Sequence, residues 1–316
     1  MASTNRPIVI GTRGSALAVW QAEFVAQRLR AAHPERQFVL QHIQTRGDVD
    51  LKSPLAEIGS TGVFVKEIEN ALLSGQIDLG VHSLKDLPSE LDPRLELAAT
   101  GPREDPRDAL VSRKEAPLTQ LPNGARIGTS SPRRAAQLKA FRPDLVVEDV
   151  RGNVDTRVRK ALGGTLDAVV LAAAGLRRLG LEGHVTEYLP PSVMLPAPCQ
   201  GIMGVEARAG DDDVLALAAA FDDPSARVVA RAERAFVKAL GGGCTTPLGA
   251  HAVIEGATIH IDGLLATPDG ARLLRDTVEG EARFPEKAGE ELAGRILAAG
   301  GREILAQIDD DGVRKW

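Results

Sequence analysis

The stretch IGTRGSA at residues 10–16 returns in altered form as IGTSSPR at residues 127–133. In both places a short apolar run ends, small hydroxyl residues follow, and a helical pattern begins. Two further pairs occur in the same order: TRGDVD (45–50) with VRGNVD (150–155), and QIDLGV (76–81) with TLDAVV (165–170). Three ordered repeats indicate two domains of similar topology.

Short apolar runs alternate with amphipathic stretches through the first of these domains. The pattern predicts strands at 7–12, 38–45 and 77–82, with helices at 15–31 and 63–73. This rhythm is typical of an α/β domain with a largely parallel sheet. The predicted fold class is therefore α/β, with two similar domains arranged like the lobes of periplasmic binding proteins.

The last part of the chain has a different order of elements. A helix at 225–240 precedes a glycine loop, three strands follow from 248 to about 278, and a helix is expected at 286–307. This order predicts a small α+β C-terminal domain. The predicted domains are 1–101 with 202–219, 107–195, and 224–316, and the proline-containing segments 102–106 and 196–201 are expected to be hinges.

Composition limits the possible partners. The chain has 316 residues, is 43% hydrophobic and carries a net charge of -5, so neither nucleic acid nor a membrane is an expected partner. The N-terminus lacks the layout of a signal peptide, and the apolar run at 168–175 is too short to span a bilayer. Cys199 and Cys244 form no disulfide framework and no metal-ligand pair. We expect a cytoplasmic protein, monomeric and without a metal.

The two strand-to-helix turns are candidate anion sites. Free backbone N–H groups and the positive end of the helix dipole gather at a helix N-terminus. Ordinary helix capping by Ser15 or Ser131 is the alternative explanation. The side chains that add donors or charge there are Arg13, Ser15, Thr129, Ser131, Arg133 and Arg134.

Arg151 and Arg157 follow another predicted strand. Ligands of open α/β sheets gather at the carboxyl ends of the strands, so these two arginines and Arg13, Arg133 and Arg134 are expected to converge on one cleft. Guanidinium groups pair with carboxylates through two parallel hydrogen bonds. The expected ligand is a polycarboxylate or a phosphate, and surface salt bridges are the alternative.

The segment VHSLKDLP at 81–88 places Lys85 and Asp86 at the end of a predicted strand. A carboxylate among arginines stays ionised, because nearby cations favour its charged form. Such a carboxylate can stabilise a cation that develops on a substrate. The alternative is a solvated pair of opposite charges.

Cys244 lies in LGGGCTTPLG at 240–249, after the C-terminus of a predicted helix. The dipole there does not favour a thiolate, and His251 is the nearest histidine in sequence. The pattern of an activated cysteine nucleophile is absent. A buried inert thiol and a covalent anchor for a ligand both remain possible.

These motifs together resemble the porphobilinogen deaminase (hydroxymethylbilane synthase) family of tetrapyrrole biosynthesis. The resemblance extends over essentially the whole chain. It rests on TRGS (12–15), TRGDV (45–49), FVKE (64–67), VHSLKDLP (81–88), REDPRDA (103–109), GTSSPRR (128–134), RGNVDTR (151–157), LAAAGLRRLG (171–180), PAPCQG (196–201) and GGGCTTPLG (241–249).

The resemblance implies a transferase that carries a dipyrromethane cofactor on Cys244 through a thioether. Four molecules of the substrate porphobilinogen add head to tail, each losing ammonia, and water releases hydroxymethylbilane. Each pyrrole ring bears an acetate and a propionate, which explains a need for arginines.

The resemblance also implies roles for individual residues. Asp86 is the expected catalytic group. The residues expected to bind the cofactor are Cys244, Lys85, Asp86, Ser131, Arg133, Arg134, Arg151 and Gly152. Those expected to bind substrate or the growing chain are Arg13, Ser15, Ser83, Thr129, Arg157, Arg178 and Gln200.

The chain departs from the family pattern at a few positions. Glu57 and Thr61 stand where many members have lysines, which puts cationic help from that loop in doubt. Cys199 often corresponds to a small residue and is interpreted as a packed thiol. Two other functions are alternatives, a bilobed anion-binding protein and a cysteine-nucleophile transferase. The first requires a secretion signal, and the second requires a histidine near Cys244.

Overall fold

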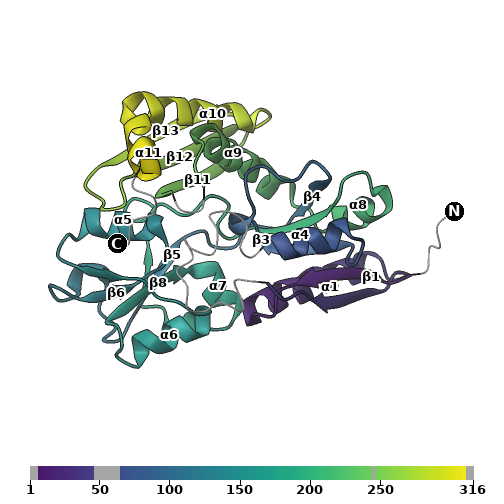
Figure 1. Ribbon diagram of the computed structural model, residues 1–316, viewed down its shortest axis with the longest axis horizontal. Helices are drawn as coiled ribbons and strands as arrows, with labels where there is room; N and C mark the ends of the chain where they lie inside the picture. The colour runs from purple at the N-terminus through teal and green to yellow at the C-terminus, as the bar shows by residue number, and fades with distance from the viewer. Residues whose placement is uncertain (1–5, 46–64, 244–245, 311–316) are drawn as a thin grey trace. The chain divides into compact units, whose positions relative to one another are not determined.

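The computed structural model describes residues 6–45, 65–243 and 246–310. Its contacts divide the chain into two compact units, coloured by residue number in Figure 1. The first unit consists of Met1–Arg103 with Ile202–Arg227, and the second of Glu104–Gly201 with Val228–Trp316. The finer domain and hinge boundaries given above stay predictions.

The first unit is built on a five-stranded sheet with strand order β2-β1-β3-β10-β4. The pairs β1–β2 and β1–β3 are parallel, whereas β10 runs antiparallel between β3 and β4. A strand from late in the chain is therefore inserted into the first sheet. The elements are β1 (Ile8–Thr12), α1 (Ala16–Ala32), β2 (Phe38–His42), α4 (Lys66–Leu73), β3 (Leu79–Ser83), η1 (Leu84–Asp86), β4 (Leu95–Thr100), β10 (Met203–Arg208), α8 (Asp212–Ala218) and η4 (Ala219–Phe221).

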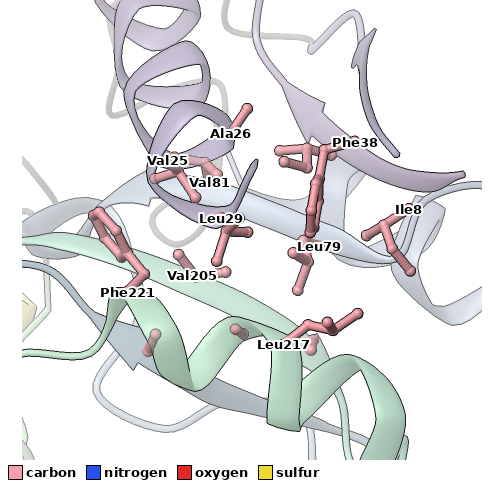
Figure 2. Close-up of a cluster of buried hydrophobic side chains, with 14 of the residues drawn as sticks. Ile8, Val25, Ala26, Leu29, Phe38, Leu79, Val81, Val205, Leu217 and Phe221 are labelled. Atoms are coloured by element: carbon pink, nitrogen blue, oxygen red, sulfur yellow. The ribbon is translucent and has the colours of Figure 1, made fainter. Parts of the chain in front are cut away.

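One face of this sheet packs against α1, α8 and η4, and Figure 2 shows the resulting core. Helix α1 contributes Val25 and Leu29, four residues apart and both fully buried. They pack with Leu79 and Val205 of neighbouring strands in the same cluster. Burial of such side chains contributes about 1.5–3 kcal/mol each, so this face fixes the direction in which α1 leaves β1.

The second unit repeats the sheet, with strand order β7-β6-β8-β5-β9. The pairs β6–β7 and β6–β8 are parallel, and β5 runs antiparallel between β8 and β9. The α/β fold class with two similar sheets is thus confirmed. The elements are β5 (Asp108–Ser112), η2 (Leu118–Gln120), β6 (Arg126–Gly128), α5 (Pro132–Phe141), β7 (Val146–Glu148), α6 (Val154–Leu162), β8 (Ala168–Ala172), α7 (Ala173–Arg178), η3 (Glu182–His184) and β9 (Glu187–Leu189).

A three-stranded antiparallel meander forms the smaller C-terminal sheet, as the sequence predicts. The helix predicted at 286–307 is wrong in one respect, because it is broken after Ile296. Gly300 has φ 107°, a conformation that favours glycine, and it interrupts the α-helical hydrogen-bond pattern. The elements are α9 (Pro224–Leu240), β11 (Leu248–Glu255), β12 (Thr258–Ala266), β13 (Leu273–Glu281), α10 (Pro285–Ile296), the π-helical turn η5 (Leu297–Gly301) and α11 (Arg302–Asp310).

Helices α9 and α10 approach closely at Gly289, and this contact yields a stability prediction. A Cβ at Gly289 would overlap the backbone oxygen of Ala232 and lie 2.8 Å from the nitrogen of Phe236. Backbone atoms cannot move aside cheaply, so we expect Gly289→Ala to lower the free energy of unfolding by about 1–3 kcal/mol.

The matched control is Gly294→Ala in the same helix. Gly294 is exposed, and a Cβ there has no neighbour within 4 Å. Alanine is a better helix former than glycine, so this variant should gain up to about 1 kcal/mol. Urea unfolding of both variants checks the prediction, and equal stabilities would contradict the close packing.

Within residues 6–45, 65–243 and 246–310, no helix combines the length and apolar character needed to cross a bilayer.

Candidate functional site

Two predicted site residues follow β1 at its carboxyl end. Arg13 comes directly after the strand and is half-buried. Ser15 caps α1, and its hydroxyl accepts a hydrogen bond from the nitrogen of Ala18 at 3.4 Å. The capping role weighed as an alternative for Ser15 is therefore present, and a ligand would use the remaining donors of this turn.

The neighbouring parallel strand β3 ends in the VHSLKDLP segment, so its residues lie at the same edge of the sheet as Arg13. After β3 the chain forms the 3-10 turn η1, in which Leu84 is buried and Asp86 is exposed, and Leu87, directly after the turn, is also buried. The nitrogen of Leu84 donates to the oxygen of Ile202, the residue before β10, at 3.0 Å. Two buried leucines thus hold the turn and direct the Asp86 carboxylate to the surface of the unit.

Ser83 lies at the last position of β3 and is held by a residue that the sequence analysis did not identify. Nε2 of Gln21, in α1, donates to the Ser83 hydroxyl at 3.0 Å, and Gln21 is buried. No motif marks Gln21, because the pairing joins residues 62 positions apart. Gln21 fixes the rotamer of Ser83 beside Lys85 and Asp86.

The corresponding edge of the second sheet carries the serine-rich turn between β6 and α5. Thr129 is buried, and its hydroxyl accepts a hydrogen bond from the nitrogen of Ser131 at 3.2 Å. Ser131 is the N-cap of α5, whose first residue is Pro132. The turn is therefore a well-formed helix N-terminus, favourable for an anion.

Arg133 and Arg134 follow in α5, and both are buried. Nη1 of Arg133 donates to Oδ2 of Asp108 at 2.7 Å, and Nη2 of Arg134 donates to Oδ1 at 2.7 Å. Asp108 is fully buried as well. Burial opposes the charge of Asp108, but the two guanidinium groups outweigh it and hold the pKa of this carboxyl below its ordinary value.

Asp108 is a second residue that the sequence analysis missed. It lies within REDPRDA, but the alternation of strands and helices does not reveal that β5 runs antiparallel. Because it does, the first residue of β5 lies beside Ala172, the last residue of β8. Asp108 consequently reaches the carboxyl edge of the parallel strands, where the arginines are.

Further arginines of the second unit are partly desolvated. Burial, then the charges of Arg134 and Arg151, lower the pKa of Arg157 to about 10. Its Nε donates to the oxygen of Gly152 at 2.7 Å, and Gly152 has φ 111°. Positive charge is concentrated here in a poorly solvated environment. A bound carboxylate would lower the electrostatic repulsion among these guanidinium groups.

Arg178 and Gln200 lie near the predicted hinge segment. Burial lowers the pKa of Arg178 to about 10, and its Nη2 donates to the oxygen of Gly201 at 2.6 Å. Nε2 of Gln200 donates to Oδ1 of Asp108 at 2.9 Å and to the oxygen of Pro106 at 2.7 Å. Cys199 is buried, as expected.

The structure thus brings the predicted residues together in two sets, one in each unit. The convergence of Arg13 with the arginines of the second unit stays a prediction, as do the ligand-binding roles. Cys244, Glu57 and Thr61 lie outside the described residues. Next to Cys244, the nitrogen of Gly243 donates to the Thr246 hydroxyl at 3.1 Å.

Two similar α/β sheets, each with cationic and hydroxyl side chains at the carboxyl edge of its strands, form the arrangement expected of an anion-binding protein. Residues 8–216 match the family domain described as porphobilinogen deaminase, dipyromethane cofactor binding domain, and residues 226–298 match porphobilinogen deaminase, C-terminal domain. The chain belongs to the porphobilinogen deaminase family.

Curated relatives agree with this result. The porphobilinogen deaminase of Roseiflexus castenholzii is 53% identical over 95% of this chain and 98% of the relative. That of Thermus thermophilus is 49% identical over 96% of this chain and 99% of the relative. Among solved structures, the VFT2 domain of Bordetella pertussis BvgS aligns over 71% of this chain and 89% of that chain, with 14% identity and a TM-score of 0.42.

Proposed function

We propose that this chain deaminates four porphobilinogen molecules and joins them head to tail into hydroxymethylbilane. In each addition the bond from the aminomethyl carbon to nitrogen breaks and ammonia leaves. A carbon–carbon bond then forms to the free α-position of the preceding ring, and that ring loses its proton. After four additions, water cleaves the bond between primer and product and supplies the hydroxyl group of the released tetrapyrrole. The observation that carries the proposal is the family match over residues 8–216 and 226–298.

Asp86 is the proposed catalytic residue. Loss of ammonia from porphobilinogen leaves an azafulvenium cation, and an ionised carboxylate within hydrogen-bond reach of the pyrrole N–H stabilises that charge. The exposed position of Asp86 on a turn anchored by Leu84 and Leu87 supports this role. Lys85, the adjacent residue, would hold an acid group of the ring.

The second unit is proposed to hold the carboxylates of the cofactor and of the growing chain. The dipyrromethane, when bound, supplies the primer ring to which the first substrate unit is added. Its acetate and propionate groups fit the desolvated cations described above, because Arg157 has its pKa lowered by burial and by neighbouring positive charges. The residues proposed to bind the cofactor are Ser131, Arg133, Arg134, Arg151 and Gly152. Those proposed to bind the substrate or the growing pyrrole chain are Arg157, Arg178, Thr129 and Gln200.

The alternative of a bilobed anion-binding protein loses its basis once the family is known, since that reading depended on fold alone. A cytoplasmic, monomeric enzyme without nucleic-acid or membrane partners remains our proposal from composition and charge. Size-exclusion chromatography with light scattering tests the monomer.

The experiment for the proposed function is a stoichiometric assay of the purified full chain. Incubation with porphobilinogen should release four molecules of ammonia for each tetrapyrrole formed. The product should be linear, and mass spectrometry of the reaction mixture identifies it. Porphobilinogen left unconsumed, or ammonia released without a tetrapyrrole, would refute the proposal.

A further inference from the structure

Asp108 collects donors from three different residues of the second unit. Oδ2 accepts from Nη1 of Arg133 at 2.7 Å, while Oδ1 accepts from Nη2 and Nε of Arg134 at 2.7 and 3.0 Å. Oδ1 also accepts from Nε2 of Gln200 at 2.9 Å. The Asp108 side chain has no exposed surface, so these hydrogen bonds take the place of water.

The charges do not balance within the group formed by Asp108, Arg133, Arg134 and Gln200. One carboxylate faces two guanidinium groups, whose side chains are only 4% and 7% exposed. Nε of Arg133 is buried and has no hydrogen-bond partner among the described residues. Asp108 therefore fixes both arginines while leaving one positive charge uncompensated within the group, which is the state required to bind a further carboxylate.

Gln200 joins this group to both predicted hinge segments. It belongs to 196–201, and its Nε2 also donates to the oxygen of Pro106, the last residue of 102–106. The same amide nitrogen thus contacts one hinge segment and the carboxylate that holds the arginines. A displacement of the hinge backbone would be transmitted to Arg133 and Arg134 through hydrogen bonds of 2.7–3.0 Å.

We propose that Asp108 is a positioning residue for the reaction: it holds Arg133 and Arg134 in their ligand-binding orientation and couples them, through Gln200, to the hinge segments. The inference rests on the proposed function. Asp108 does not touch the reacting atoms, and its effect reaches them through the arginines. When the hinge geometry changes as the pyrrole chain grows, the positions of Arg133 and Arg134 change, and so does their binding of the carboxylates.

The first test compares Asp108→Asn with Asp78→Asn, a matched control in the first unit. Asp78 is buried and also accepts from two arginines, Arg6 at 2.7 Å and Arg208 at 2.9 Å. Both variants lose a buried charge, but only Asp108→Asn touches the proposed binding group. Each is purified as the full chain for unfolding, intact-mass and kinetic measurements.

For Asp108→Asn we expect either a fraction of chains carrying dipyrromethane that is about tenfold lower, or a KM for porphobilinogen that is about tenfold higher. For KM, a tenfold rise corresponds to about 1.4 kcal/mol of lost binding. For Asp78→Asn, the cofactor content and the KM should both stay within about twofold of the wild-type values, even if the variant is less stable. A folded Asp108→Asn chain with the cofactor content and KM of Asp78→Asn would overturn the proposal. Failure of the wild type itself to consume porphobilinogen would instead refute the proposed function.

Gln200→Met is the second variant, and it tests the coupling to the hinge segments whether or not Asp108→Asn folds. It removes the amide donor but leaves both pairs between Asp108 and the arginines. We expect kcat to fall at least about fivefold, roughly 1 kcal/mol, and chains bearing partly elongated product to accumulate by intact mass. Wild-type kcat and wild-type mass distribution in this variant would overturn the coupling to the hinge.

Discussion

Replacing Asp86 with alanine is expected to lower kcat at least about 100-fold, the usual effect of removing one electrostatic stabiliser of a transition state. The carboxylate is exposed, whereas Leu84 and Leu87 hold the turn. The variant should therefore fold normally, with a free energy of unfolding within about 0.5 kcal/mol of the wild type. Steady-state kinetics and thermal unfolding of the same preparation check both parts.

The matched control for Asp86→Ala is Asp213→Ala. Asp213 is also exposed and lies in the first turn of α8, in the same unit. Its removal takes away the same charge at a position outside the proposed site, so kcat should stay within about twofold of the wild type. If Asp86→Ala kept substantial turnover, or if both variants lost activity equally, the catalytic role of Asp86 would be excluded.

The second large effect is expected for Cys244→Ser. The denatured wild-type chain should weigh two pyrrole units more than its sequence, because a thioether survives denaturation. Cys244→Ser should lose this surplus together with turnover, since a serine oxygen is a far weaker nucleophile than a thiolate. Intact-protein mass spectrometry under denaturing conditions is the measurement.

Cys199→Ser provides the control for the thiol. Cys199 is buried, and its sulfur lies 3.9 Å from the oxygen of Ala230, a contact that a serine hydroxyl can also make. This variant should retain the two added pyrrole units. A wild-type enzyme that is active with an unmodified mass would remove the covalent anchor from consideration.

The repeated strand-to-helix motifs predicted the fold well because they depend only on residues that are close together in the sequence. Each IGT segment occupies the end of a parallel strand, at β1 and at β6, and a serine caps the following helix. Periodicity and capping residues are local signals, and the shared topology of the parallel strands in the two sheets could be predicted from them. The break at Gly300 was missed because helical periodicity continues on both sides of it.

Contacts between distant residues were not predictable in the same way. Arg133 and Arg134 were expected to bind a ligand, yet each also pairs with Asp108, 25 and 26 positions earlier in the chain. A short apolar run such as DALVS does not reveal the direction of its strand, so the position of Asp108 could not be predicted. Gln21 was missed for a similar reason, because an isolated glutamine in a helix carries no motif.

The insertion of β10 between β3 and β4 has a consequence for biosynthesis. Residues 203–208 leave the ribosome after all of β5 to β9, so every strand of the second sheet is available before the first sheet receives its fifth and last strand. Protein domains ordinarily fold from the N-terminus onward as they are made. In this chain β3 and β4 emerge early but lack their common neighbour β10, so the strand edges that β10 covers stay unpaired on the nascent polypeptide until the second sheet has emerged.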